Sequence, residues 1–262
     1  MFLENIKEVA VSAGEYIRHA MLGLHNLDIT EKSPNSLVSE VDKNSEKMVV
    51  NSLNKLIPGA GFITEENTTT QSKAEYTWVI DPLDGTTNYL NAVPCFSVSI
   101  ALMYCETIIA GAVYEVSRDE LFYSEAGGGA YLNGNKIHVN NSKDFSNILI
   151  ATGFPYDSED EIDIYLNIIK KCQLASKGIR RFGSAAVDLC YTAVGRFGLY
   201  YESKLNIWDV AAGALIASEA GAIVCDYQGG NNYLLGREII ASAPQHIDKI
   251  LKIIQEEYKK DL

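Results

Sequence analysis

Hydrophobic residues near the start of the chain recur every three or four positions. This spacing predicts an amphipathic first helix, which carries Ile6, Val9, Ala10, Ala13, Ile17 and Ala20. A second helix is predicted over residues 41–57, where Pro58-Gly59 ends it. Residues 95–103 then alternate as a strand does, and residues 108–114 and 120–124 continue as strands. Because Asn133-Gly134 is a typical hairpin turn, we expect this central stretch to be antiparallel.

Beyond about residue 145 the pattern becomes an alternation of strands and helices. Strands are predicted at residues 148–151, 199–201, 223–225 and 239–241, and helices at 160–171, 185–193, 210–220 and up to about 259. Such alternation is typical of α/β organisation. The sequence therefore predicts a mixed α+β and α/β chain with an N-terminal subdomain (1–145) and a C-terminal subdomain (146–262), joined without a Pro/Ser-rich linker.

The stretch from Trp78 to Asn88 (WVIDPLDGTTN) carries the most chemical information. An apolar run bounded by Asp-Pro and Asp-Gly predicts a buried strand that ends in a turn. Asp81 and Asp84 then project from the carboxyl end of the strand, where sheet proteins bind ligands. Both dipeptides are also ordinary turn sequences, so this stretch alone does not decide between a turn and a site.

Other acidic residues also lie at predicted element ends. Glu65 and Glu66 follow an apolar run, and Asp209 follows Trp208 before a long apolar segment, where an Asp commonly caps a helix. Oxygen ligands without nearby His or Cys suit Mg²⁺ better than zinc. Gly85 and the following amides could approach an anion. Metal ligands beside an anion site indicate phosphate ester chemistry.

Two motifs make the chain resemble the inositol monophosphatase family. These are Asp81-Pro-Leu-Asp84-Gly-Thr-Thr-Asn and Trp208-Asp209-Val-Ala-Ala-Gly213, in the family's order and with the Glu65-Glu66 pair upstream. Two long motifs in order are more specific than one glycine-rich loop. The resemblance implies a layered αβαβα sandwich, a homodimer, lithium sensitivity and two or three Mg²⁺ ions.

The resemblance also implies roles for individual residues. The expected metal ligands are Glu65, Asp81, the carbonyl of Leu83, Asp84 and Asp209. The expected catalytic groups are Glu65 and Thr86, which orient and deprotonate a water, and Asp42, which supports Thr86. The expected substrate contacts are Asp84, Gly85, Thr86, Ala186, Glu202 and Asp209. Further candidates near the phosphate or the sugar are Lys32, Glu66, Arg180 and Arg181, the last two being equally consistent with a solvated charged face.

The predicted function is a phosphoric monoester hydrolase in which metal-activated water attacks phosphorus directly. The favoured substrate is inositol 1-phosphate; fructose 1,6-bisphosphate, NADP, 3′-phosphoadenosine 5′-phosphate and histidinol phosphate remain alternatives. A haloacid-dehalogenase phosphatase also has an Asp pair, but Pro82 and Leu83 separate Asp81 from Asp84 here, against a single residue there. A non-catalytic module that binds a divalent cation is the alternative from another class.

Composition limits the expected partners and cellular location of the protein. A formal net charge of −12 disfavours nonspecific binding to nucleic acid or to anionic membranes. The five cysteines include no Cys-x-x-Cys pair, and the N-terminal segment is acidic where a signal peptide would be basic. We therefore expect a cytoplasmic enzyme that binds a small phosphorylated substrate.

Overall fold

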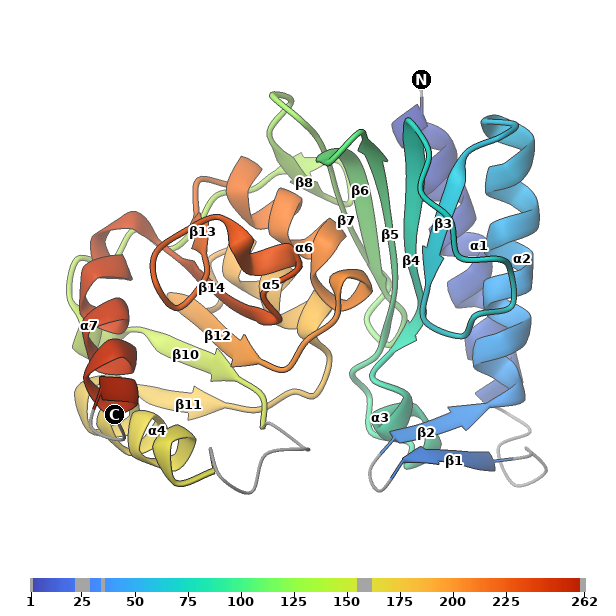
Figure 1. The fold of residues 1–262 in the computed structure, drawn as a ribbon. Coiled ribbons are helices and arrows are strands. Elements are labelled where there is room, and N and C mark those ends of the chain that lie inside the picture. The colour runs from blue at the N-terminus through green and yellow to red at the C-terminus, as the bar shows by residue number, and fades with distance from the viewer. Residues whose placement is uncertain (1, 22–28, 34–35, 155–161, 260–262) are drawn as a thin grey trace.

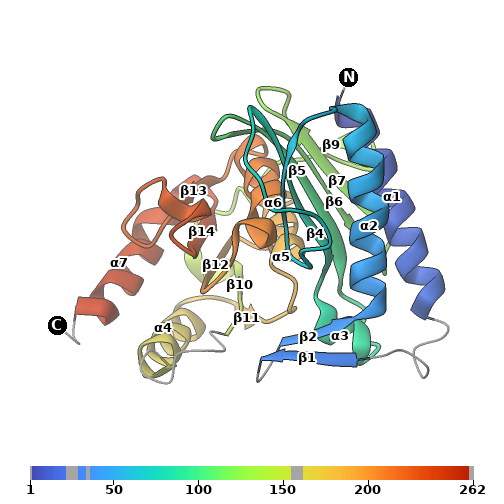
Figure 2. The same cartoon turned by 45° about the vertical axis from the view of Figure 1, so that its right-hand side comes forward.

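Helices and sheets alternate across the molecule in layers (Figure 1). The computed structural model describes residues 2–21, 29–33, 36–154 and 162–259. Helices α1 and α2 cover one face of the first sheet, α5 and α6 lie between the two sheets, and α4 and α7 cover the far face of the second sheet (Figures 1 and 2). This is the predicted αβαβα sandwich.

The first sheet has seven strands in the order β3-β4-β5-β6-β7-β8-β9. Strands β3 and β4 are parallel, and every later pair is antiparallel, as predicted for the central stretch. The strands are β3 (Gly61–Thr64), β4 (Tyr76–Asp84), β5 (Ser97–Tyr104), β6 (Thr107–Glu115), β7 (Glu120–Glu125), β8 (Ala130–Leu132) and β9 (Asn135–Lys136).

The second sheet has five strands in the order β11-β10-β12-β14-β13. Strand β10 is parallel to both neighbours, whereas β14 is antiparallel to both of its own. The strands are β10 (Leu149–Thr152), β11 (Gly178–Arg180), β12 (Leu199–Ser203), β13 (Ile223–Cys225) and β14 (Glu238–Ser242). A separate hairpin, which the sequence did not predict, joins β1 (Ile29–Ser33) and β2 (Ser36–Ser39).

The helices bury the faces that their sequence periodicity predicts. In α1, for example, Ile6, Ala10, Ala13 and Ile17 all point into the core. The helices are α1 (Phe2–Ala20), α2 (Glu40–Leu56), α3 (Thr86–Leu90), α4 (Ile162–Ala175), α5 (Ala185–Ala193), α6 (Ile207–Glu219) and α7 (Ile247–Tyr258). Residues 160–161 of the predicted helix 160–171 lie outside the described residues, and α4 continues beyond its predicted end to Ala175. None of the described helices is both long enough and apolar enough to cross a membrane.

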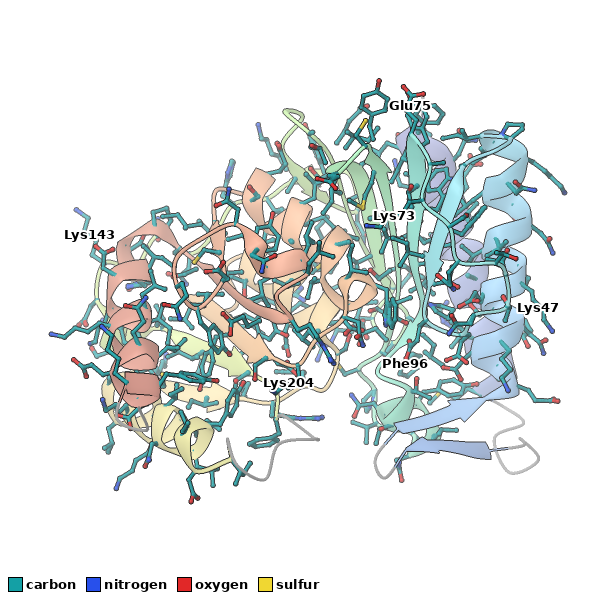
Figure 3. All side chains as sticks on the ribbon, viewed as in Figure 1. Lys47, Lys73, Glu75, Phe96, Lys143 and Lys204 are labelled. Atoms are coloured by element: carbon teal, nitrogen blue, oxygen red, sulfur yellow. The ribbon has the colours of Figure 1, made fainter. Side chains whose placement is uncertain are left out.

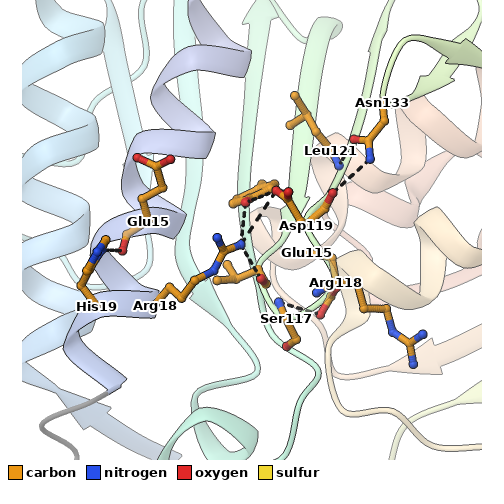
Figure 4. Close-up of polar contacts among 11 residues, drawn as sticks. Glu15, Arg18, His19, Glu115, Ser117, Arg118, Asp119, Leu121 and Asn133 are labelled. Carbon is orange, nitrogen blue, oxygen red and sulfur yellow. Dashed lines mark hydrogen bonds and ion pairs between the residues drawn. The ribbon is translucent and has the colours of Figure 1, made fainter.

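The turn between β6 and β7 is fastened to α1 (Figure 4). Arg18 donates to the Tyr114 hydroxyl at 2.7 Å and to the Val116 carbonyl at 2.8 Å. Buried Glu115 accepts from the backbone N–H groups of Ser117 and Arg118 at 3.2 and 2.7 Å. These contacts hold the turn at the end of the first sheet against the outer helical layer.

The main apolar core crosses the expected boundary near residue 145. Val79, Ala101 and Val113 of the first sheet belong to the same buried cluster as Ala212 and Ala214 of α6. Helix α6 approaches β6 so closely that a Cβ on Gly111 would lie 3.1 Å from the Ala212 Cα. The chain changes sheets between Lys136 and Leu149, but the two parts share this core.

Candidate active site

A cavity of about 290 Å³ brings the predicted acidic residues together. Its wall includes Glu65, Asp81 and Asp84 from the first half of the chain and Glu202 and Asp209 from the second. Leu83, Gly85 and Thr86 also line it. The cavity therefore contains every predicted metal ligand and the turn that was predicted to bind phosphate.

The parallel pair β3 and β4 places the first three acids at one edge of the sheet. The Glu65 N–H donates to the Ile80 carbonyl at 3.3 Å, just beyond the end of β3. The pairing of β4 with β5 becomes irregular between Asp81 and Asp84, and the Leu83 N–H donates to Asp81 Oδ1 at 3.0 Å. This irregularity keeps both aspartates at the cavity within a nominally alternating strand.

The glycine after Asp84 is required by backbone geometry. Gly85 has φ +93°, and a Cβ there would lie 3.0 Å from the Cys95 carbonyl oxygen. It directly precedes the short helix α3, so the predicted sequence of turn and helix start is present. In Figure 3, Phe96, which lies beside Gly85, is on the half of the molecule with the first sheet, and Lys204 is on the other half.

The Thr86 hydroxyl connects this turn to helix α2. Thr86 Oγ1 lies 3.0 Å from Asp42 Oδ1 and 3.0 Å from the Leu83 carbonyl oxygen. The hydroxyl has one proton, so these two acceptors compete for it. Asp42 is fully buried. The hydroxyl keeps acceptor capacity toward a water in the cavity.

Asp209 reaches the cavity from the first turn of α6. Asn206, and not Asp209, occupies the N-cap position, so α6 begins before the predicted Val210. Asp209 lies three residues inside the helix, and its Oδ2 accepts from the Asn206 N–H at 2.6 Å. The capping interpretation is thus corrected in position, and Asp209 both closes the helix start and lines the cavity.

Burial and the charges of their neighbours disfavour ionisation of the carboxylates that line the cavity. Burial, followed by the charges of Glu65, Asp84 and Asp209, raises the pKa of Asp81 well above its usual value. Burial raises the pKa of Asp84 to about 6 despite hydrogen bonds from Ser184 and Ala186. Burial and the charge of Asp84 raise the pKa of Asp209 to about 8. Each shift shows that a further positive charge would stabilise the ionised cluster.

The donor set fits a hard divalent cation. It consists of carboxylates and one carbonyl, and the described residues of the cavity wall include no His or Cys. Within the described part of the chain, no three His, Cys, Asp or Glu side chains already surround one point as ligands. The oxygen donors on the wall nevertheless match the ligand chemistry of Mg²⁺.

On the second half of the wall, Glu202 is held by a hydroxyl and by close packing. The Tyr200 hydroxyl donates to Glu202 Oε2 at 2.8 Å. A Cβ on Gly153 would lie 1.9 Å from Glu202 Oε1, so only glycine leaves room for the carboxylate. Burial raises the pKa of Glu202 to about 7, although Tyr200 and Arg181 oppose this shift.

Some of the remaining predicted residues line the cavity and others do not. Arg181 lines the cavity, whereas Arg180 donates to its neighbour's carbonyl, that of Ile179, at 2.8 Å and does not line it. Ala186 is fully buried and its N–H donates to Asp84 Oδ2 at 2.8 Å, so Ala185 takes the place on the wall that was expected for Ala186.

Of the two further candidates, Glu66 is not among the described residues that line the cavity. Glu66 follows Glu65 and uses its N–H to donate to Glu46 Oε2 at 2.7 Å. Lys32 lies in β1, and its side chain is outside the described part of the structure.

Sequence reasoning missed several residues that support the site. Ser184 donates to Asp84 Oδ2 at 2.6 Å, and Glu46 and Ser45 on α2 bond to the loops that carry the acids. The helical spacing of α2 could have revealed the residues on that helix. Asp42, Ser45 and Glu46 place three polar groups on the face that the periodicity assigns to the core.

The family model for the inositol monophosphatase family matches residues 2–259. The chain therefore belongs to the inositol monophosphatase family. This confirms the resemblance carried by the two motifs.

Curated relatives and solved structures agree with this assignment. The Nus factor SuhB of Pasteurella multocida (strain Pm70) is 39% identical over 260 residues, covering 96% of each chain. Extragenic suppressor protein suhB from Bartonella henselae matches with a TM-score of 0.92 at 35% identity, over 97% of this chain and 98% of that one. Inositol monophosphatase from Anabaena (Nostoc) sp. PCC 7120 matches with a TM-score of 0.86 at 31% identity, over 97% and 95%.

Proposed function

We propose that the protein is a Mg²⁺-dependent phosphatase that hydrolyses the phosphate monoester of a small polyol, most simply inositol 1-phosphate. The observation that carries this proposal is the convergence of Glu65, Asp81, Asp84 and Asp209 on one cavity beside Gly85 and Thr86. A purely structural cation site needs neither a phosphate-binding turn nor a water-orienting hydroxyl.

The chain's own residues divide the work. Glu65, Asp81, Asp84, Asp209 and the Leu83 carbonyl hold the metal ions, which when bound supply Lewis acidity and an activated water. Thr86, whose hydroxyl lies 3.0 Å from Asp42 Oδ1, would orient that water together with Glu65, and the Glu65 carboxylate would accept the proton that the water loses. Backbone amides at Gly85 and Thr86 bind the phosphoryl oxygens. Hydrolysis then proceeds without a nucleophilic side chain.

Recognition of the alcohol falls to the second half of the cavity. Glu202 is a half-buried carboxylate within a shape set by Gly153 and Tyr200, and it accepts hydrogen bonds from substrate hydroxyls. Arg181 adds positive charge on the same wall. This arrangement favours a hydroxyl-rich ester.

The direct test is phosphate release from inositol 1-phosphate, fructose 1,6-bisphosphate, 3′-phosphoadenosine 5′-phosphate, NADP and histidinol phosphate, each with Mg²⁺ and with excess chelator. We expect metal-dependent hydrolysis with inositol 1-phosphate fastest. Asp84→Asn should reduce the rate by about a thousandfold, because it removes several kcal/mol of metal-mediated stabilisation. Wild-type rates from folded Asp84→Asn protein, or a trapped phosphoenzyme, would contradict the mechanism.

A second candidate function rests on the names of the relatives. Several curated relatives, including that of Escherichia coli (strain K12) at 38% identity, are named Nus factor SuhB. A role in binding transcription proteins is therefore the alternative for this chain. Asp84→Asn separates the two functions, because a binding role would survive loss of the carboxylate while hydrolysis would not.

We also propose a homodimer in the cytoplasm. The chain has an acidic net charge of −12, and its cysteines are free. Sedimentation analysis should give twice the mass of one chain; a single-chain mass at micromolar concentration would refute the dimer.

A further inference from the structure

One turn of helix α2 bonds to all three segments of the first half that line the cavity. Asp42, Ser45 and Glu46 are fully buried although all three are polar. Asp42 accepts from Thr86 at the start of α3, and the Ser45 hydroxyl donates to the Pro82 carbonyl at 3.1 Å. Glu46 bonds to the segment after β3. The three bonds therefore connect the turn to the segments that carry Glu65, the Asp81–Asp84 pair and Thr86.

Glu46 makes the most extensive of these connections. Its Oε1 accepts from the Thr64 hydroxyl at 3.0 Å and from both the N–H and the hydroxyl of Thr68 at 2.7 Å. Its Oε2 accepts from the Glu66 N–H at 2.7 Å. One buried carboxylate thus receives four hydrogen bonds from the segment 64–68, on both sides of Glu65. Its neighbour Lys47 points outward from the same helix (Figure 3).

The segment that Glu46 holds is a loop with little other regular structure. It leaves β3 at Thr64, and Asn67 has a positive φ of 54°. Gln71 adds bonds at Thr64, accepting from its N–H at 2.9 Å and donating to its hydroxyl at 2.9 Å. Beyond Glu65, the N–H groups of Glu66 and Thr68 donate to Glu46, and the Asn67 amide donates to the Glu65 carbonyl at 2.9 Å. Glu46 therefore connects both sides of Glu65 to helix α2.

We infer that Glu46 is a positioning residue: it sets the place of Glu65 relative to the Asp81–Asp84 pair and thereby the affinity of the site for Mg²⁺. The inference rests on the proposed function. Groups that orient metal ligands typically change metal affinity or activity by about 10- to 100-fold when they are replaced.

Glu46→Gln is the sharpest test because it keeps size and one acceptor oxygen. Its amide NH₂ must face either the Glu66 N–H or the Thr68 N–H, which are both donors, so one of the two bonds is lost. We expect the Kd for Mg²⁺, measured by calorimetry without substrate, to rise about tenfold. At saturating Mg²⁺ the kcat should stay within about threefold, because Glu65 can still reach the metal once it is bound.

Two further variants separate positioning from general destabilisation. Glu40→Gln makes the same charge change at an exposed position of the same helix and should leave the Kd unchanged. Thr68→Ala removes one hydroxyl donor to Glu46 while keeping the carboxylate, and should raise the Kd severalfold in the same direction. Should Glu46→Gln not fold, Thr68→Ala carries the test.

The outcomes distinguish this inference from the proposed function. Wild-type Mg²⁺ affinity in folded Glu46→Gln, or in Thr68→Ala where Glu46→Gln does not fold, would overturn the positioning role. A lower melting temperature of metal-free Glu46→Gln than of the wild type, with an unchanged Kd for Mg²⁺, would assign Glu46 to stability alone. Mg²⁺ binding without hydrolysis of any ester would refute the phosphatase but leave the Kd comparison valid. Wild-type protein that binds no Mg²⁺ would overturn both.

Discussion

The two walls of the cavity hold their carboxylates in different ways. On the first wall, hydrogen bonds with buried side chains of α2 fix the segments around Glu65, Pro82 and Thr86: Glu46 and Asp42 accept, and Ser45 donates. On the second wall, Glu202 depends on the Tyr200 hydroxyl and on the space left by Gly153. The first wall is defined by hydrogen bonds, whereas the place of Glu202 on the second wall depends strongly on the space left by Gly153.

This difference suggests a division between reaction and recognition. A bonded frame tolerates little change in ligand geometry, which suits groups that must hold metals and orient water. A wall defined by shape can be altered by one side chain without disturbing that frame. Substitutions on the first wall should therefore lower kcat or metal affinity, and those around Glu202 on the second wall should raise KM.

Among the residues that are not proposed as metal ligands, the largest effect is expected at Thr86. Thr86→Ala removes the hydroxyl beside Asp42, and kcat should fall at least about a hundredfold, the usual range for losing general acid-base assistance. Steady-state kinetics at saturating Mg²⁺ measures this loss. Thr86→Ser keeps the hydroxyl and should retain most activity; equal losses in both variants would show that packing, and not the hydroxyl, matters.

Gly153→Ala tests the second wall. Its Cβ would lie 1.9 Å from Glu202 Oε1 and must displace the carboxylate. We expect KM for inositol 1-phosphate to rise about tenfold, equivalent to about 1.4 kcal/mol. Hydrolysis of 4-nitrophenyl phosphate, which lacks the polyol hydroxyls, is the control and should not change. A matching loss on both esters would mean that the wall also serves the reaction.

Arg180 and Arg181 provide a matched pair of exposed arginines. Arg181→Ala removes a positive charge from the cavity wall and should raise KM by about three- to fivefold, since exposed charges are screened by water. Arg180→Ala should have no effect. The difference in KM between the two variants should shrink at high salt. Equal KM values at low salt would show that Arg181 does not bind the substrate.

The smallest expected effect is on stability without metal. The pKa values of Asp84, Asp209 and Glu202 are raised to about 6, 8 and 7. Between about pH 4 and pH 8 the folded protein therefore binds more protons than the unfolded chain, and stability falls as pH rises. With chelator, the melting temperature should be several degrees lower at pH 8 than at pH 5.

Two comparisons identify the cavity as the cause of that slope. Mg²⁺ should restore the melting temperature at pH 8, because it binds the folded state. Asp84→Asn should flatten the pH dependence more than Glu40→Gln does. A metal-free protein equally stable at both pH values would contradict the strain inferred for the carboxylate cluster.

Sequence predicted most of the first wall because its residues are contiguous. Asp81, Asp84, Gly85 and Thr86 lie in one motif, and the apolar run before them defines the strand. The β1–β2 hairpin escaped prediction because its strands are short and mostly polar, so they lack the alternation that marks a half-buried strand.

The second wall was harder to predict because its residues meet only in the folded chain. Gly153 directly follows β10, Tyr200 and Glu202 lie in β12, and nothing in the sequence indicates that a glycine faces a carboxylate. The substrate contact predicted for Ala186 stays a prediction: its N–H donates to Asp84 Oδ2, and its neighbour Ala185 lines the cavity. Asp209 lines the cavity, but it lies in the first turn of α6 and not at the N-cap position that the sequence suggested.

The close approach of α6 to β6 at Gly111 also limits motion. Asp209 belongs to a helix whose neighbours include the first sheet, so its position is tied to the frame of Asp81 and Asp84. Swinging the two halves apart would open the shared apolar core, which makes hinge closure over the substrate energetically unfavourable. We therefore expect selectivity to come from a preformed cavity, with crystal structures of free and ligand-bound protein nearly superimposable.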